Sequence, residues 1–279
     1  MHIGCHLSFS NGYAAMGREA LSIGADCFQF FSRNPRGGKA KAFDRADAQE
    51  LKNIMDKHNF APILVHAPYT FNPCSADGGL RKFAYEAMSE DLPKLDIFGD
   101  KGLYNFHPGS HVGQGVEKGI ELTADLLKRV YEKEFKAQVL VETMSGKGSE
   151  IGFTFEQVAE ILEKSQTSAG VCLDTCHVYS AGYDIVNDLD KVVEDFDRII
   201  GLGKLKAIHL NDSMTGFNSK KDRHEKIGKG TIGLEAIKRI IKHPKLKNLP
   251  FYLETPNDLE GYHQEILLLS GAGARCASH

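Results

Sequence analysis

Residues 139–143 read Val139-Leu140-Val141-Glu142-Thr143, and this short stretch decides the fold. Three apolar residues in succession, two of them β-branched, are typical of a strand buried on both faces, as the strands of a parallel sheet are. The run then ends in a carboxylate and a hydroxyl group. The sequence therefore predicts a buried strand with a polar carboxyl end.

The same unit recurs along the chain. Seven further short apolar runs end in polar or glycine-rich residues, at residues 3–8, 27–32, 63–66, 103–107, 171–175, 207–211 and 251–255. Helical patterns lie between them at residues 46–58, 117–131, 154–162, 188–200, 233–241 and 261–269. Strand and helix in alternation predict a parallel sheet, and eight units close a (β/α)8 TIM barrel. An open doubly wound sheet is the alternative, disfavoured because no glycine-rich phosphate loop follows the first run.

Length and composition set the expected context. The 279 residues suit one barrel domain, expected over residues 1–270, and the small, polar residues 271–279 favour a short disordered tail. No stretch is apolar for long enough to cross a membrane, and the first ten residues lack the pattern of a secretory signal. Six cysteines without a CxxC pair do not indicate a disulfide framework. We therefore expect a reducing cytoplasm, and a monomer is the default expectation.

Potential metal ligands end six consecutive predicted strands, from the third to the eighth. They are His66, His107, Glu142, Asp174, His209 and Glu254. Three more candidates, His177, Asp222 and His224, lie in loops just after predicted strands. Because a TIM barrel gathers the carboxyl ends of its strands on one rim, we expect these nine side chains to converge there.

A metal centre explains this pattern better than nine unrelated residues do. A single histidine at a strand end is more often structural, and a single carboxylate is often a helix N-cap. Carboxylates that converge without cations would repel each other and lose solvation. Imidazole and carboxylate groups together suit zinc, manganese or iron, and nine ligands are about right for three ions that share one carboxylate.

Several motifs resemble the endonuclease IV family of apurinic/apyrimidinic endonucleases. They are NFHPGSH (residues 105–111), VET (141–143), CLDTCH (172–177), IHLND (208–212), DRH (222–224), GKG (228–230) and LET (253–255). The motifs occur in the family's order, and the resemblance extends from residue 3 to about residue 269. It implies a zinc-dependent TIM barrel that acts in DNA repair.

The resemblance also implies roles for the nine residues. His66, His107 and Glu142 would hold one zinc ion, and Glu142 would bridge to a second ion held also by Asp174, His209 and Glu254. His177, Asp222 and His224 would hold the third, with manganese or iron as substitutes. Such enzymes hydrolyse the phosphodiester 5′ to an abasic site, leaving a 3′-hydroxyl and a 5′-deoxyribose phosphate, and they clean blocked 3′ ends. Glu142 would be the catalytic residue beside the attacking water.

Contacts to double-stranded DNA are implied at two loop positions. Arg36 and Tyr69 match residues with which the family enters the minor groove beside a flipped-out abasic nucleotide. The following Gly37-Gly38-Lys39 departs from the bulkier residues of some members. A formal net charge of −3 argues weakly against DNA binding, but three divalent ions would reverse its sign where the backbone docks.

Two other functions remain open. A sugar isomerase or epimerase on a similar barrel would also gather histidine and carboxylate ligands, although a third ion site is more than isomerising a small sugar requires. A protein that binds damaged DNA without cutting it is the other alternative, which an intact ligand set disfavours.

Overall fold

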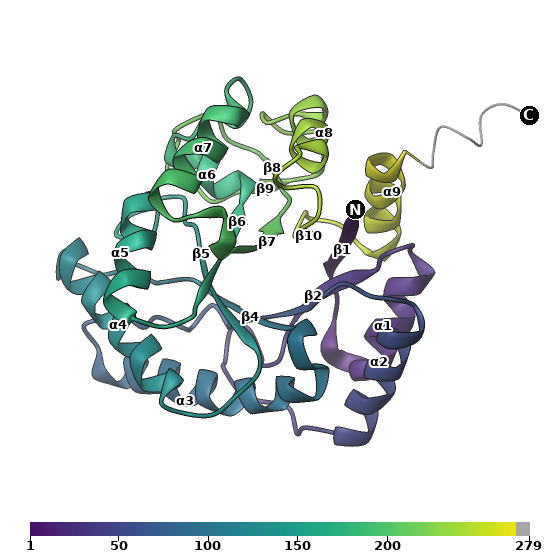
Figure 1. Ribbon diagram of the computed structural model, residues 1–279, viewed down its shortest axis with the longest axis horizontal. Helices are drawn as coiled ribbons and strands as arrows, with labels where there is room; N and C mark the ends of the chain where they lie inside the picture. The colour runs from purple at the N-terminus through teal and green to yellow at the C-terminus, as the bar shows by residue number, and fades with distance from the viewer. Residues whose placement is uncertain (272–279) are drawn as a thin grey trace, which may run out of the picture.

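A closed parallel barrel forms the centre of the molecule (Figure 1). The computed structural model describes residues 1–271, so the predicted tail lies outside the described residues apart from Gly271. The barrel strands are β1 (His2–His6), β2 (Cys27–Phe31), β3 (Ile63–His66), β4 (Gly102–Phe106), β5 (Gln138–Glu142), β6 (Gly170–Asp174), β7 (Leu205–His209) and β10 (Pro250–Leu253). Each strand pairs in parallel with its neighbours, and β1 closes the barrel against β10. The TIM-barrel prediction is confirmed.

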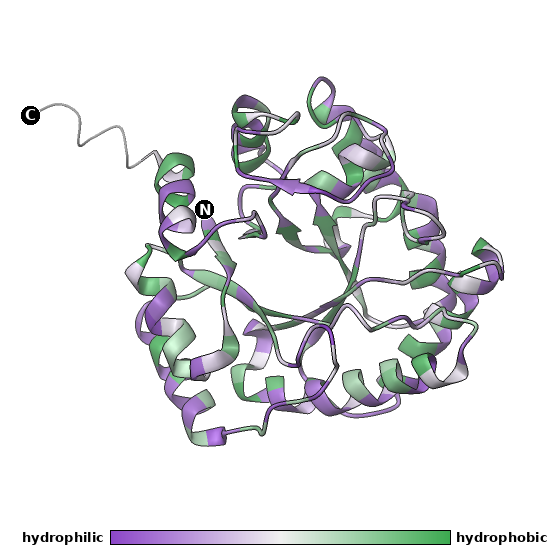
Figure 2. Cartoon of the chain, turned by 180° about the vertical axis from the view of Figure 1, so that it is seen from behind, coloured by the Kyte–Doolittle hydropathy of each residue, from purple (hydrophilic) through white to green (hydrophobic). Residues whose placement is uncertain are grey.

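Helices surround the barrel on its outer side (Figure 1). They are α1 (Tyr13–Ser22), α2 (Arg45–Lys57), α3 (Gly78–Leu95), α4 (Val116–Tyr131), α5 (Phe155–Ser165), α6 (Thr175–Ala181), α7 (Leu189–Ile199), α8 (Leu234–Lys242) and α9 (Leu259–Ser270). Hydrophobic and hydrophilic residues alternate along the outer helices, as expected for helices with one buried face (Figure 2). The predicted helical segments match α2, α4, α5, α7, α8 and α9, whereas α1, α3 and α6 were not identified. Within the described residues, no helix is long and apolar enough to cross a membrane.

The barrel interior contains its own apolar layer. Cys27, Leu64, Leu103, Leu140, Cys172, Ala207 and Tyr252, together with Ala61, form a buried cluster separate from the larger core. The larger core includes the alternate strand positions, such as Val139 and Val141, and the inner faces of the helices. Because side chains two apart on a strand point to the same side, this layer identifies which residues of each strand face the barrel axis.

A two-stranded antiparallel sheet lies beyond β7. It pairs β8 (Asp212–Ser213) with β9 (His224–Glu225). The buried Asp212 carboxylate accepts backbone N–H groups from Gly228 at 2.9 Å, Gly230 at 3.2 Å and Ile232 at 2.9 Å. A side chain at residue 230 would collide with the Ser213 carbonyl, so only glycine allows this close approach. One buried carboxylate thus holds the segment of residues 228–233 that follows β9, the strand that begins at His224.

Candidate metal centre

A second interior layer, made of polar side chains, lies directly above the apolar one. Each member follows an interior apolar residue by two positions and so faces the same way. They are Gln29, His66, Asn105, Glu142, Asp174, His209 and Glu254. His107 follows Asn105 by two residues in turn. The six predicted strand-end ligands therefore converge on the axis, as their positions in the sequence indicated.

Glu142 lies at the centre of this layer. Its carboxylate has no exposed surface, yet four imidazole groups lie beside it. Oε2 is 3.2 Å from Nε2 of both His66 and His107. Oε1 is 3.1 Å from Nδ1 of His209 and 3.4 Å from Nδ1 of His177. A carboxylate so placed can interact with two neighbouring cations, one through each oxygen.

Three overlapping groups of side chains bring their donor atoms within 4.8 Å of one another, which is close enough to hold a metal ion. They are His66, His107 and Glu142; then Glu142, Asp174, His209 and Glu254; and finally Asp174, His177 and His224. Asp222 lies beside the third group, with Oδ1 3.3 Å from Nε2 of His177 and 3.4 Å from Nε2 of His224. The structure therefore brings all nine predicted residues together, and it places Asp174 near the third group as well as in the second.

Three histidines are oriented by backbone carbonyl groups. Nδ1 of His66 donates to Ala67 O at 2.7 Å, and Nδ1 of His177 donates to Thr143 O at 2.9 Å. Nδ1 of His224 donates to a backbone carbonyl at 3.3 Å. Each bond fixes the tautomer and turns Nε2 toward the other ligands. Among the described residues, Nε2 of His177 and of His224 is buried without a hydrogen-bond partner, as a nitrogen that binds a metal would be.

The electrostatics of the layer favour positive charge. Burial opposes ionisation of Glu142, but the adjacent His209 and His107 hold the pKa of this carboxyl well below its ordinary value. Burial opposes protonation of His177, yet Asp174, Asp222 and Glu142 raise the pKa of this imidazole well above its ordinary value. Positive charge among these carboxylates is therefore favoured, and divalent ions would supply it. The donor set therefore fits a cluster of divalent cations.

Three amide side chains that sequence reasoning missed hold the carboxylates in place. Nδ2 of Asn105 donates to Glu142 Oε2 at 2.5 Å. Asn211 donates to Asp174 Oδ2 at 2.7 Å and accepts the backbone N–H of Glu254 at 2.8 Å. Gln29 donates to Glu254 Oε1. Gln29 and Asn105 could have been identified from the sequence, because each lies two residues beyond an apolar residue that faces the barrel interior.

Two neighbouring hollows, which share Phe31 and Tyr69 in their walls, lie at the site. One, of about 420 Å³, is lined by His66, His107, His177, Asp222, His224 and Glu254, with Tyr69 and Phe31 at its side. The other, of about 710 Å³, is lined by Arg36, Lys39, Lys41 and again Tyr69. Tyr69 is 66% exposed, and its ring centroid lies 5.1 Å from that of Phe31. Of the two predicted DNA contacts, Tyr69 therefore borders both hollows and Arg36 borders the second.

The comparisons with known proteins agree with the motifs. Residues 18–271 match the model of a family described as xylose isomerase-like TIM barrels. A protein of Clostridium beijerinckii named probable endonuclease 4 is 60% identical over 271 residues, which are 96% of this chain and 98% of that protein. The crystal structure of endonuclease IV from Thermus thermophilus superposes with a TM-score of 0.86 at 30% identity, covering 99% of this chain and 100% of that one.

The chain belongs to the endonuclease IV family of apurinic/apyrimidinic endonucleases. It is thus an enzyme of the deoxyribonuclease IV type, a phosphodiester hydrolase, as the motifs predicted. A D-psicose 3-epimerase from Clostridium cellulolyticum also superposes, with a TM-score of 0.66 over 99% of both chains, but at 14% identity. That likeness shows a shared fold alone, so the sugar-epimerase alternative gains no support beyond the barrel itself.

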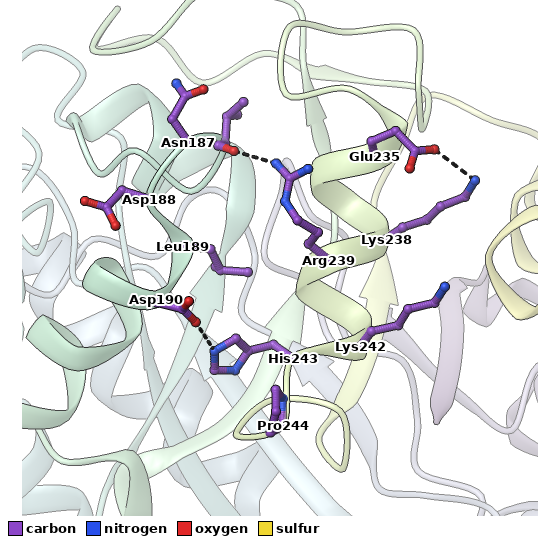
Figure 3. A pocket seen from close by; sticks show the side chains of 11 residues that line it. Asn187, Asp188, Leu189, Asp190, Glu235, Lys238, Arg239, Lys242, His243 and Pro244 are labelled. Carbon is purple, nitrogen blue, oxygen red and sulfur yellow. Dashed lines mark hydrogen bonds and ion pairs between the residues drawn. The ribbon is translucent and has the colours of Figure 1, made fainter.

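A further pocket on the outer wall is distinct from the endonuclease site. It lies between α7 and α8 and shares no lining residue with the ligand cluster (Figure 3). Several of its charged groups are paired: Nε2 of His243 lies 3.0 Å from Asp190 Oδ1, Lys238 contacts Glu235 at 3.1 Å, and Arg239 donates to a backbone carbonyl. Among the described residues, none of the side-chain groups whose donor atoms could together hold a metal ion lies at this pocket, so it does not compete as a metal centre.

The Asn105–Glu142 contact gives a direct test. We expect Asn105→Ala to lower DNA cleavage or metal affinity by about 10- to 100-fold, the usual cost of losing a partner that orients a ligand. Asn187→Ala is the matched control, because the Asn187 side chain donates to the Asp184 carboxylate on the surface, away from the ligands. Cleavage rate, metal content and thermal unfolding would be measured on both variants. A folded Asn105→Ala protein with unchanged cleavage and metal content would refute the orienting role.

Proposed function

We propose that this endonuclease hydrolyses the phosphodiester 5′ to abasic sites in double-stranded DNA, leaving a 3′-hydroxyl and a 5′-deoxyribose phosphate, and that it also removes blocking groups from 3′ ends. The observation that carries the proposal is the convergence of nine histidine and carboxylate side chains at the rim of an endonuclease IV barrel. Cytoplasmic location and a monomeric state are part of the same proposal.

The proposed metal centre holds three zinc ions, with manganese or iron as substitutes. The first is assigned to His66, His107 and Glu142; the second to Glu142, Asp174, His209 and Glu254; the third to His177, Asp222 and His224. The overlapping groups of donor atoms support the first two sets, and the contacts of Asp222 with both histidines support the third. Tetrahedral nitrogen and oxygen coordination is what zinc prefers.

The proposed mechanism assigns separate tasks to the site and to the protein around it. Bound divalent ions supply Lewis acidity, which stabilises charge on the phosphate and on the leaving oxygen and makes water more acidic. Glu142, held by Asn105 and the imidazoles, orients the attacking water and accepts its proton. His66, His107 and Tyr69 line the cavity in which the reacting phosphodiester would lie.

Selectivity for abasic sites would follow from access. A nucleotide without a base has little stacking and no pairing, so turning it out of the helix costs less than extruding an intact nucleotide. The cavity above the ligands, about 420 Å³ with Tyr69 at its side, suits a sugar and its phosphates. Arg36 and the exposed ring of Tyr69 are placed beside it, where they could enter the minor groove and support a bent duplex.

A defined duplex tests the reaction and Glu142 together. With a single abasic analogue in one strand, we expect one incision, with a 3′-hydroxyl on its 5′ side, and none in the undamaged duplex. Glu142→Gln keeps the side-chain shape but removes the charge and the proton acceptor, so single-turnover cleavage should fall by ~10²-fold or more. Abasic-duplex binding should change far less. Cleavage within a few-fold of wild type, at unchanged metal content, would exclude Glu142 from this role.

Metal content tests the third ligand set. We expect about three transition-metal equivalents in the active protein, because nine ligands support three ions. His224→Ala should remove about one equivalent and impair cleavage while the fold persists, since the other two sets are intact. Elemental analysis would be combined with circular dichroism of both proteins. A His224→Ala protein with wild-type metal content would place the third ion elsewhere or show that it does not exist.

The DNA-contact assignment has its own test. Tyr69→Ala should weaken binding to the abasic duplex without changing metal content, because an inserted side chain stabilises the kinked duplex. Arg36→Ala should weaken binding and also reduce its salt dependence, since one phosphate-facing cation is lost. Dissociation constants at several salt concentrations would be compared with those of Arg18→Ala, which removes a distant exposed arginine. If both loop variants match wild type, the assignment is wrong.

A further inference from the structure

A buried ion pair lies beneath the loop that carries Arg36. Arg33 and Asp91 expose only 6% and 2% of their side chains. Nε of Arg33 donates to Asp91 Oδ2 at 2.8 Å, and Nη2 donates to Oδ1 at 3.2 Å, so the pair is bidentate. Ser32 adds a bond to Asp91 Oδ2 at 2.7 Å, and Lys94 one to Oδ1 at 2.9 Å. Glu90 accepts from Arg33 at 2.6 Å. The residues after β2 are therefore joined to helix α3 by a network of charged groups.

Stability alone does not account for this pair. Removing two charges from water is costly, and well-packed apolar residues of similar volume often stabilise a protein as much as a buried ion pair does. What an ion pair adds is direction, because the planar guanidinium group accepts only one relative placement of its partners. The role of Arg33 and Asp91 can therefore be inferred from the part of the chain whose position they fix.

What the ion pair fixes is the conformation of the loop that carries Arg36, between Arg33 and Ala40. Nη1 of Arg33 donates across the loop to Gly38 O at 3.4 Å, and an isolated antiparallel bridge joins Arg33 to Ala40. Within the loop, Asn34 Oδ1 accepts the backbone N–H of Arg36 at 3.0 Å, and Asn34 O accepts that of Gly38 at 2.7 Å. Arg36 stands exposed at the tip, while Arg33 is buried at the base. The base thus determines where the tip lies.

Two further contacts complete the placement. Gly38 has φ +68° and lies against Phe83 of α3 so closely that a Cβ atom would fall 2.4 Å from the ring. The backbone N–H of Tyr69 donates to Pro35 O at 2.9 Å, which ties the loop after β3 to the loop after β2. Movement of the Arg36 loop would therefore also move Tyr69.

We propose that Arg33 and Asp91 are positioning residues for DNA binding: their buried ion pair holds the Arg36 loop, and through Pro35 also Tyr69, in the conformation that receives the abasic duplex. The inference rests on the proposed function, in which Arg36 and Tyr69 contact DNA. It adds that the contact surface is preorganised from beneath by an ion pair whose two side chains are almost fully buried. Preorganisation lowers the cost of ordering a loop when the ligand binds.

The test replaces both charges at once. Arg33→Met combined with Asp91→Leu leaves the net charge unchanged and fills the site with apolar side chains. We expect KM for the abasic duplex to rise on the order of tenfold, within the coupling that contacting residues usually show, while kcat and metal content stay near wild type. Arg18→Met with Glu50→Leu is the matched control, since that pair is also in close contact, at 2.6 Å against 2.8 Å for Arg33 and Asp91, but is more than half exposed. The control should leave KM unchanged.

A double-mutant cycle tests whether the ion pair acts through the Arg36 loop. In an Arg36→Ala background, the Arg33→Met/Asp91→Leu change should raise KM much less than it does in wild type, because the pair acts through the loop. Independent, additive effects would overturn the proposal, as would an unchanged KM in the pair variant. Should the pair variant fold poorly, Arg33→Lys keeps the charge but loses the guanidinium fork, and it is expected to raise KM in the same direction.

Hydrogen exchange separates this inference from the proposed function. The amides of Gly38 and Tyr69 are bonded across the loops, so both should exchange faster in the pair variant than in wild type. Unchanged exchange at both amides would refute the positioning role, whatever the enzyme cleaves. A wild-type protein that leaves abasic duplexes intact would refute the proposed function instead, and the exchange result would still decide whether the ion pair holds the loops.

Discussion

A fully buried carboxylate surrounded by imidazoles is the interaction on which the rest of the site depends. Glu142 lies beside four histidines, and its side chain is fully buried from bulk solvent. An isolated charge in such a place would cost several kcal/mol, so the surrounding layer must supply positive charge, as protons or as metal ions. The remaining strand-end ligands lie around Glu142, where the histidines among them and any bound cations can balance its charge. The apolar layer below Glu142 excludes water from that side, so its charge must be balanced by neighbouring groups alone.

The rigidity of the site differs from one side to the other. His66, Glu142, Asp174 and His209 belong to barrel strands, whose positions are set by hydrogen bonding on both sides and by the packed interior. Asp222 lies in the loop between β8 and β9, and Asp212 of β8 holds the segment after β9 through backbone N–H groups. Strand residues give fixed distances between charged groups, whereas loop residues can adjust to a substrate. This division suits a centre whose core must be exact in geometry while its edge admits a large, deformable polymer.

Most of the fold could be predicted because the strands of a parallel barrel are short, continuous apolar runs, and most of the ligand cluster could be predicted because those runs end in histidines and carboxylates. Six of the helices had clear amphipathic patterns; α3 did not, since it begins with Gly78-Gly79 and contains Pro93 near its end. Helix α6 was missed because it begins directly after Asp174, at Thr175, which we assigned to the preceding strand, while His177 within it was assigned to a loop. The supporting amides were missed for another reason. Asn105 and Gln29 can be identified as site residues only once it is known which residues of each strand face the barrel interior. Asn211 contacts both Asp174 and Glu254, which lie at the ends of strands distant in sequence.

The shared barrel explains why proteins with this fold can have different functions. Any closed sheet of this kind presents a ring of interior positions at the carboxyl ends of its strands, and a D-psicose 3-epimerase has the same scaffold at 14% identity. The particular chemistry must then come from which residues occupy that ring and from the loops above it. In this chain the ring is filled with histidines, carboxylates and amides that support one another, and the adjoining depression is bordered by Arg36, Lys39 and Tyr69. A small sugar needs no such basic surface beyond the ligands, but a polyanion that extends past the site does.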